Sequence, residues 1–528
     1  MPRKIKDSIY GYIEIDDNDV MSVIDNSAFQ RLRDIRQTGY ASVYPCSSHN
    51  RFSHSLGVYH LGGIVAKILE ADFNRLIKNC KEFVINLDFS RYRKLFVLAC
   101  LCHDIGHAPF SHSSEHFYLE HDSIWEQLRG VVRDKAVEWK NETGAPHEIM
   151  SALVALRQFK SVLKKIDEKS FFARCIIGLK YTDKNPETEI KNCFISLLNS
   201  NTIDVDKLDY LIRDSVTIGF KSVDIDYNRL LSSYCFRKKN DSIILTVNKS
   251  ALSVLESVIF AHDMERKWIQ NHPVILYEDY LVKYAVSECI KSYRTNEIDL
   301  FSYDAITEKG VGNDKERVVL LSDSDIISFL KKKSLDFILF KEFFDRKSRK
   351  KPVWKSEAEF NILFEKSSIS GEAVKQLVER FEGIENSFKE DNLLPVINDD
   401  LIKKYSDKIN LQKAIIKDTE IELKRAMDLF KLLKAVAEDN GMSFEYVIIT
   451  SDKFNTGFDK AAFKQIQIYF PAIDMSKKLE DCIVSLQGQK KEKNKFFYLY
   501  INEKATEKFR KELIDKLLSY AQQNYLEL

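Results

Sequence analysis

The most constraining feature of this sequence is residues 95–102, LFVLACLC, a stretch that is apolar on every side. A helix without a polar face has to be buried all round, so the stretch predicts a helix at the centre of a bundle. Glycine (17) and proline (9) are scarce among the 528 residues, which favours long helices over a sheet-rich fold. Apolar stripes with helical spacing also follow His54 and run through residues 203–214. We therefore predict a mainly α fold.

Charge and cysteine content exclude several classes of protein. Lys and Arg number 80 against 79 Asp and Glu, so there is no global field of the kind that marks a nucleic-acid coat or a membrane-surface protein. No apolar run is long enough to cross a bilayer, and the first residues lack the apolar core of a signal peptide. The 9 cysteines include no C-x-x-C pair, which favours reduced thiols. We expect a cytoplasmic protein that has no contact with a membrane.

The distribution of histidine divides the chain in two. None of the 11 histidines follows His272, and nine of them precede residue 150, so we expect the chemistry in a core formed by residues 1–290. Residues 291–528 are predicted as a helical and α+β region for oligomerisation or regulation. Its predicted strands are residues 443–450, 465–470 and 496–501, and a helix is predicted over residues 505–522.

A His-Asp pair, His103-Asp104, ends the buried stretch. Burying ionisable groups needs compensation, and a divalent cation with imidazole and carboxylate ligands would supply it. A structural ion pair is the alternative interpretation. His54 and Asp206 favour the metal, because they lie on two other core-facing helices and bundles build interior metal sites from facing helices.

Three segments carry a resemblance to a known family: residues 48–58 (SHNRFSHSLGV), 101–112 (LCHDIGHAPFSH) and 203–210 (IDVDKLDY). They resemble the HD-domain phosphohydrolases, and more narrowly the deoxynucleoside triphosphate (dNTP) triphosphohydrolases typified by the vertebrate enzyme that joins a sterile-alpha-motif domain to an HD domain. The similarity runs from about residue 9 to residue 214 and weakens toward residue 290. No counterpart of the sterile-alpha-motif module is expected.

The resemblance implies a fold and a metal site. Residues 1–290 would be an HD-domain helical bundle with phosphohydrolase activity, followed by the smaller α+β region. A divalent metal (Mn, Fe, Mg or Zn) would be bound, and additional Mg would accompany the nucleotide. The implied metal ligands are His54, His103, Asp104 and Asp206.

The resemblance also implies a reaction, which is hydrolysis at the α-phosphorus of a dNTP to yield a deoxynucleoside and inorganic triphosphate. Catalytic roles fall on His107 and His112 against the phosphates and on His147 as general acid toward the 5′-oxygen. Thr38 stands where the family has an apolar residue, which leaves the strictness of deoxy over ribo selection open. Trp268 is the candidate for a second sugar-stacking aromatic. The implied substrate-binding residues are Arg51 and Lys207 for phosphate, and Gln37, Tyr210 and Asp214 for the deoxyribose.

The same family places an activating guanine nucleotide at positions that match Asp25, Gln30 and Arg33. A nucleotide bound there would bridge subunits, so a homo-oligomer, a dimer or a tetramer, is expected. The alternative is a polar helix face packed within one subunit, and Lys6 in place of the expected asparagine weakens the transfer. The basic run at residues 346–351 is predicted as a solvated face, with a nucleotide phosphate or a nucleic-acid backbone as the alternative.

Three functions are consistent with these residues. The first is a metal-dependent dNTP triphosphohydrolase that lowers dNTP pools, either for housekeeping or in antiviral defence, under control by an activating or inhibitory nucleotide. The second is an HD-domain phosphohydrolase or phosphodiesterase acting on another nucleotide, a cyclic or oligonucleotide messenger, or single-stranded nucleic acid. The third is a non-catalytic nucleotide sensor, which is disfavoured because the complete ligand and histidine set is present.

Overall fold

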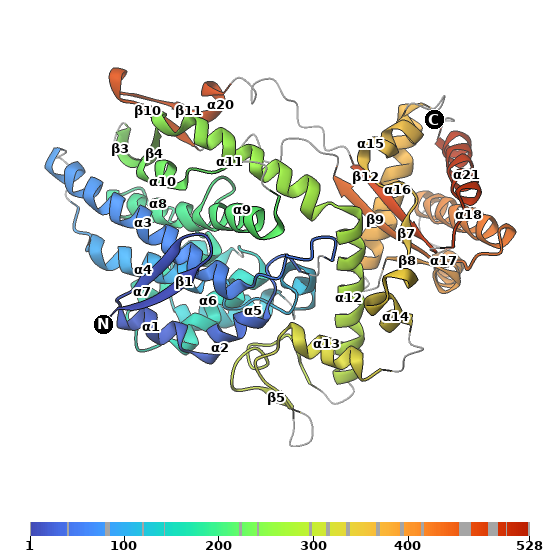
Figure 1. Ribbon diagram of the computed structural model, residues 1–528, viewed down its shortest axis with the longest axis horizontal. Coiled ribbons are helices and arrows are strands. Elements are labelled where there is room, and N and C mark those ends of the chain that lie inside the picture. Colours follow the sequence, from blue (N-terminus) through green and yellow to red (C-terminus); the bar gives the residue numbers. More distant parts are fainter. Residues whose placement is uncertain are drawn as a thin grey trace. The chain divides into compact units, whose positions relative to one another are not determined.

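The computed structural model describes most of the chain. The described residues are 2–39, 42–79, 85–118, 121–141, 143–220, 224–239, 242–294, 298–312, 317–333, 338–365, 370–390, 395–412, 417–452, 466–483, 495–502 and 504–525. Helices dominate this part of the chain (Figure 1), which confirms the predicted mainly α class. The chain divides into two compact units, each built from separate stretches of sequence.

Unit 1 comprises residues Met1–Arg266, Val286–Leu330 and Thr456–Lys490. Its core is a helical bundle in which α3 packs on α4 and α9, and α7 packs on α4 and α6. The bundle and its N-terminal elements are β1 (Arg3–Asp7), β2 (Gly11–Ile15), α1 (Asn18–Ile24), α2 (Ser27–Gln30), the 3-10 helix η1 (Arg31–Asp34), α3 (Arg51–Asn79), α4 (Phe89–Cys102), the 3-10 helix η2 (Ser111–Phe117), α5 (His121–Val132), α6 (Pro146–Gln158), α7 (Ile166–Ile177), α8 (Pro186–Leu198) and α9 (Val205–Ile218). The later elements are α10 (Tyr227–Ser232), β3 (Tyr234–Lys239), β4 (Ser242–Asn248), α11 (Leu252–Glu265), β5 (Val311–Gly312), β6 (Arg317–Val318), α13 (Asp323–Lys331), β10 (Gln467–Phe470), β11 (Met475–Lys478) and α20 (Leu479–Cys482).

The stretch expected to be buried on every side is the C-terminal half of α4. Its residues are buried except Val97, which is half-buried. The neighbouring helix α3 approaches closely at Gly62, where a Cβ atom would lie 2.6 Å from Cys100 Sγ. The close contact of these two helices brings the start of α3 next to the end of α4, where His103 and Asp104 follow.

Unit 2 comprises residues Lys267–Ala285, Lys331–Asn455 and Lys491–Leu528. Its sheet has the strand order β7-β12-β9-β8, and α16 packs on β9 and β12. The helix α12 (Pro273–Arg294) contributes residues to both units. The remaining elements of unit 2 are α14 (Ile338–Phe344), β7 (Lys351–Pro352), α15 (Glu357–Phe360), α16 (Gly371–Glu390), β8 (Val396–Ile397), α17 (Asp399–Gln412), α18 (Lys417–Asp439), β9 (Tyr446–Asp452), β12 (Lys495–Ile501) and α21 (Glu507–Tyr525).

One predicted strand belongs to a different sheet from the other two. Residues 446–452 and 495–501 form β9 and β12, which pair with each other in unit 2. The third, β10, pairs in parallel with β4 of unit 1, in the strand order β11-β10-β4-β3. Residue 465 of that prediction lies outside the described residues. The proposed functional boundary at residue 290 stays a prediction.

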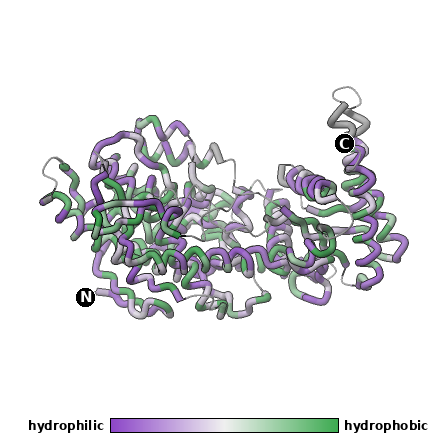
Figure 2. The backbone as a smooth tube through the Cα atoms, turned by 90° about the horizontal axis from the view of Figure 1, so that it is seen from above, coloured by the Kyte–Doolittle hydropathy of each residue, from purple (hydrophilic) through white to green (hydrophobic). Residues whose placement is uncertain are grey.

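Figure 2 shows hydrophobic and hydrophilic residues alternating along the helices, as expected where each helix buries one face. No helix in the described ranges combines the length and the apolar character needed to span a bilayer. Within those ranges no disulfide bond joins two cysteines.

Candidate metal centre and phosphohydrolase site

The structure brings the four predicted metal ligands together from three helix ends. His54 lies in the first turn of α3, His103 and Asp104 follow α4, and Asp206 lies in the first turn of α9. The His54 Nε2 atom is 3.2 Å from His103 Nε2, 2.9 Å from Asp206 Oδ1 and 3.6 Å from Asp104 Oδ2. The His103 Nε2 atom is 3.4 Å from Asp104 Oδ1 and 3.5 Å from Asp206 Oδ1. Ligands held about 2.1 Å from one cation lie about 3 to 3.5 Å apart. His54, His103 and Asp104 form a group whose ligand atoms have spacing suited to one metal ion, and Asp206 Oδ1 lies close to both imidazole nitrogens.

The hydrogen bonds on the far side of both imidazoles define the ring atoms that face the cluster. His54 Nδ1 donates to Asp209 Oδ2 at 2.7 Å, and His103 Nδ1 donates to the Cys100 carbonyl at 2.9 Å. Because a carboxylate and a carbonyl only accept, Nδ1 of each ring carries a proton, and Nε2 is the nitrogen that faces the cluster. The two Nε2 atoms, 3.2 Å apart and beside the Asp104 and Asp206 carboxylates, lie where a proton or a cation would be held.

The carboxylates around His54 favour a positive charge at this ring, carried by a proton or supplied by a cation. Burial would lower the pKa of His54, but hydrogen bonds to Asp206 and Asp209, together with the Asp104 charge, raise that pKa to about 10. The Asp206 side chain is 34% exposed whereas His54 and Asp104 are buried. The candidate metal centre is therefore open to solvent on the side of Asp206.

A buried ion pair outside the predicted set orients His54. Asp209 accepts from Arg213 Nε at 2.9 Å and from Tyr10 OH at 2.7 Å, and Arg213 also binds Asp7 at 3.0 Å. A carboxylate behind a ligating histidine sets its tautomer and strengthens it as a ligand. The sequence carried a signal for this pair, because Asp209 and Arg213 are four residues apart on the helix that bears Asp206.

The three histidines expected to act in catalysis also lie together. The rings of His107 and His147 stack at 4.2 Å between centroids, and the His112 ring lies 5.1 Å from His107 and 5.2 Å from His147. His107 Nε2 lies 3.2 Å from Asp104 Oδ1, so this group adjoins the metal cluster. Its catalytic role stays a prediction.

Glu115, which the sequence analysis missed, joins two of these histidines. Its Oε1 atom contacts His112 Nδ1 at 2.8 Å and also pairs with His147 Nδ1. Burial would lower the pKa of His147, yet the Glu115 carboxylate raises it. For His107, burial and the Arg51 charge lower the pKa well below its ordinary value. The contacts thus favour the protonated form of His147 and the neutral form of His107. A second group with metal-ligand spacing is formed by His107, His112, Glu115 and His147.

The two residues predicted to bind phosphate lie beside the metal cluster and contact protein groups in this structure. Arg51 is buried, with Nη1 at 2.7 Å from Asp104 Oδ2 and Nε donating to Ser111 Oγ at 2.9 Å. Lys207 Nζ contacts Asp204 Oδ2 at 2.7 Å and the Ser200 carbonyl at 2.8 Å. Phosphate binding by both residues stays a prediction.

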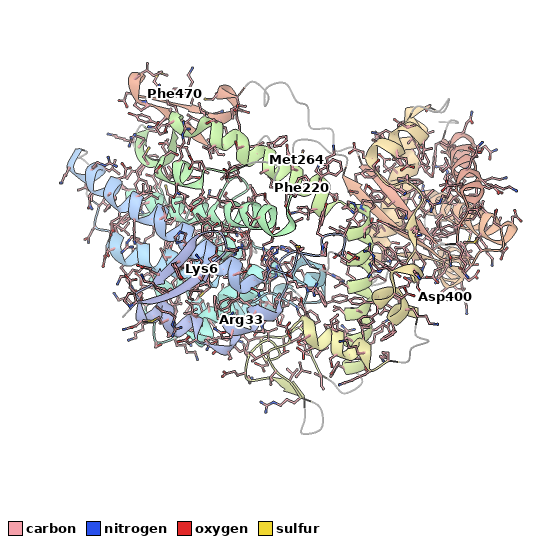
Figure 3. The ribbon with its side chains drawn as sticks, viewed as in Figure 1. Lys6, Arg33, Phe220, Met264, Asp400 and Phe470 are labelled. Carbon is pink, nitrogen blue, oxygen red and sulfur yellow. The ribbon has the colours of Figure 1, made fainter. Side chains whose placement is uncertain are left out.

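Two of the predicted deoxyribose-binding residues lie around His49. Asp214 Oδ1 is 2.5 Å from His49 Nε2, and the backbone nitrogen of Gln37 donates to the His49 carbonyl at 3.1 Å. The Gln37 Oε1 atom is buried and has no hydrogen-bond partner among the described residues. Glu265 at the end of α11, next to Met264 in Figure 3, shares a hydrogen bond with Asp214 and was not among the predicted residues.

Tyr210, the third predicted deoxyribose-binding residue, is half-buried on α9, one turn after Asp206. Trp268 belongs to unit 2 and is 44% exposed.

The residues predicted to bind a regulatory nucleotide lie around α2 and make local contacts. Asp25 pairs with Arg3 Nη1 at 2.5 Å, Gln30 Nε2 donates to the Ile24 carbonyl at 2.6 Å, and Gln30 Oε1 accepts from Arg33 Nε at 2.8 Å. Arg33, labelled in Figure 3, covers the Phe52 ring at 3.6 Å. Nucleotide binding here stays a prediction.

The predicted solvated basic face at residues 346–351 is wrong for two of its members. Arg349 and Lys350 are buried in unit 2, where Arg349 pairs with Glu278 at 2.5 Å. Lys350 pairs with Glu342 at 2.8 Å and with Glu445 at 2.7 Å. These acidic partners lie far from the basic run in the sequence. The run of charges alone therefore does not indicate that two of its members are buried.

Comparison with known proteins identifies the class to which this site belongs. Residues 51–190 match the HD domain family, and they include His54, His103, Asp104, His107, His112 and His147. The chain therefore contains an HD domain, and the resemblance noted in the sequence is confirmed.

Particular relatives are deoxynucleoside triphosphate triphosphohydrolases. The chain is 32% identical over 286 residues to the SAMHD1 homolog of Dictyostelium discoideum, with 54% of this chain and 49% of the relative covered. It is 31% identical over 241 residues to SAMHD1 of Gallus gallus, with 43% of this chain and 35% of the relative covered. The chain thus spans about half or less of these curated relatives. A crystal structure of a hypothetical protein from Aquifex aeolicus shares the fold, with a TM-score of 0.55, 19% identity and coverage of 97% of this chain and 100% of that one.

Proposed function

We propose that this protein is a metal-dependent phosphohydrolase that cleaves dNTPs to a deoxynucleoside and inorganic triphosphate. The observation that carries the proposal is the cluster of candidate ligand atoms from His54, His103, Asp104 and Asp206, which is open at Asp206 and adjoined by a second group of histidines. The HD domain match and the similarity to dNTP triphosphohydrolases support metal-dependent phosphohydrolase chemistry.

The residues around the cluster have the properties that this reaction needs. A bound divalent cation would polarise the α-phosphate and favour deprotonation of water. Asp209 and the Cys100 carbonyl keep His54 and His103 in the ligating tautomer. His147, kept protonated by Glu115, is the residue we assign to donate a proton to the leaving 5′-oxygen. Arg51 and Lys207 supply positive charge for the phosphates.

We assign binding of the deoxyribose to Gln37, Tyr210 and Asp214. The unpartnered Gln37 Oε1 atom and the Asp214 carboxylate offer acceptors for a sugar hydroxyl. Regulation by a nucleotide at Asp25, Gln30 and Arg33 and assembly into a dimer or tetramer belong to the same proposal. So do a cytoplasmic location and a role in lowering dNTP pools, which would serve housekeeping or antiviral defence.

Product analysis tests the reaction. The protein is loaded with Mn, Fe, Mg or Zn and incubated with each dNTP alone and in mixtures, because an enzyme that needs a nucleotide activator is inactive on a single substrate. Release of triphosphate and deoxynucleoside is expected. Release of pyrophosphate or monophosphate alone would contradict the proposal, and nucleotide binding without turnover would indicate a sensor.

A variant of one proposed ligand tests the metal site. Asp206→Ala removes the exposed ligand and should abolish both metal retention and turnover. Because Asp206 lies in the first turn of α9 and outside the packed core, helicity by circular dichroism should stay close to the wild type. Full activity with this variant would show that the ligand set is wrong.

A further inference from the structure

The loop between α4 and η2 carries His107 and has an unusual backbone. Phe110 and Ser111, immediately before His112, have φ of 57° and 55°. This left-handed conformation is unfavourable for residues other than glycine, so it persists only where the surroundings hold it. The position of both histidines therefore depends on whatever holds this loop.

One holding group comes from a segment more than 200 residues later in the sequence. Asp323, the first residue of α13, is buried, and its Oδ1 atom accepts the Phe110 amide at 2.6 Å. Its Oδ2 atom accepts the Arg36 amide at 3.1 Å. Arg36 in turn offers its carbonyl to Ser111 Oγ at 2.5 Å. A single carboxylate thus ties the left-handed turn to the strand-like segment after η1.

The second holding group is the buried guanidinium of Arg31 in η1. Its Nη2 atom donates to the His107 carbonyl at 2.7 Å and to the Ile105 carbonyl at 3.1 Å. Its Nη1 atom donates to the Leu321 carbonyl at 2.7 Å. Arg31 therefore joins the histidine loop directly to the residues that precede Asp323.

We propose that Arg31 and Asp323 are positioning residues that hold the loop before η2 in its working conformation, and with it His107 in the loop and His112 in the first turn of η2. We name these two residues and their contacts the loop brace. The brace lies outside the HD domain match at residues 51–190, so the chain supplies this support from its own flanking segments. Its catalytic consequence rests on the proposed function, whereas its effect on the loop does not.

Hydrogen exchange tests the loop without any substrate. In Asp323→Ala the Phe110 amide loses its acceptor, so exchange in peptides covering residues 105–113 should accelerate by about tenfold or more. Asp325→Ala is the matched control, because Asp325 lies on the same turn and accepts from Ser322 rather than from the loop. It should leave that exchange unchanged. Equal acceleration in both variants, or acceleration throughout unit 1, would reduce Asp323 to a general structural role and overturn the proposal.

Kinetics test the consequence for catalysis. Asp323→Ala should lower kcat by about 100-fold with KM and metal content close to wild type, because misplaced catalytic groups cost rate more than binding. Arg31→Lys, which retains a donor for one carbonyl, should fall between wild type and Arg31→Met. The losses in Arg31→Met and Asp323→Ala should be less than additive in the double variant, since both act on one loop. An unchanged kcat with accelerated exchange would reject the catalytic part of the proposal. If the wild type releases no triphosphate from dNTPs, the proposed function fails while the exchange result still decides the brace.

Discussion

His54 Nδ1 and Asp209 Oδ2 lie 2.7 Å apart in a buried hydrogen bond, and Arg213 holds the same carboxylate from its other side. This contact joins residues that are 155 positions apart in the sequence. It makes the orientation of a proposed metal ligand depend on a residue outside the proposed ligand set.

Replacing Asp209 with Asn should weaken metal binding by about 10- to 100-fold, because the neutral amide no longer strengthens His54 as a ligand. The change also places an amide NH₂ near Arg213. Titration of the metal-free protein with Mn or Zn, followed by calorimetry, measures the affinity. Asp226→Asn, at the start of α10, is the control because Asn caps a helix as well as Asp does. Equal affinities in both variants would argue against the supporting role of Asp209.

Gly57 in α3 should not tolerate alanine, although alanine is normally the better helix former by about 1 kcal/mol. A Cβ atom there would collide with Asp209 Oδ1 and lie 2.5 Å from Arg213 Nη2. Gly57→Ala is therefore expected to lower both the melting temperature and the metal affinity. Gly63→Ala, in the same helix with open space around the added atom, should be neutral or stabilising. Thermal unfolding of the two variants decides between local crowding and helix propensity.

Glu115 should matter for turnover and not for metal retention. Glu115→Gln keeps the side-chain volume but removes the charge that keeps His147 protonated, so we expect kcat to fall by about 100-fold or more. The metal content, measured by mass spectrometry, should be unchanged. Glu126→Gln removes an exposed charge on α5 and should leave kcat at the wild-type value. Normal turnover in Glu115→Gln would exclude the assignment of His147 as a proton donor supported by Glu115.

Acid stability should depend on the buried side chain of Glu138. Burial would raise the pKa of Glu138, but the Thr182 amide and hydroxyl, each donating at 2.7 Å, and the nearby Arg174 lower it to about 2. A carboxyl whose pKa is lower in the folded state stabilises the fold above its ordinary pKa of 4.5 and loses this contribution as the pH falls toward 2. Denaturation of Glu138→Gln across this range should show a flatter pH dependence than wild type. Exposed Glu256→Gln should follow the wild type, and parallel curves for all three proteins would contradict the prediction.

The amino-acid pattern was sufficient for the helices and for the identity of the cluster residues. The apolar residues 95–102, which leave no polar face, predicted the buried part of α4, because the side chains of a helix decide which of its faces is buried. The motifs around His54, His103 and Asp206 named the four candidate ligands, because few residue types have the chemistry to bind a divalent cation. Turn-poor composition likewise predicted the mainly α class.

Contacts between distant segments were decided only in the tertiary structure. Three contacts of this kind are those of Asp209 with His54, Glu115 with His147 and Asp323 with Phe110. In each, the partner lies on another segment of the chain, so the local sequence pattern does not indicate it. The strand β10 looked like part of the C-terminal sheet, yet its backbone hydrogen bonds go to β4, because a β propensity specifies an extended strand and not its neighbour. Arg349 and Lys350 looked solvated but are buried, because Glu278, Glu342 and Glu445 supply the opposite charges that make burial possible. Sequence determined which side chains are able to do chemistry here, and packing decided which of them meet.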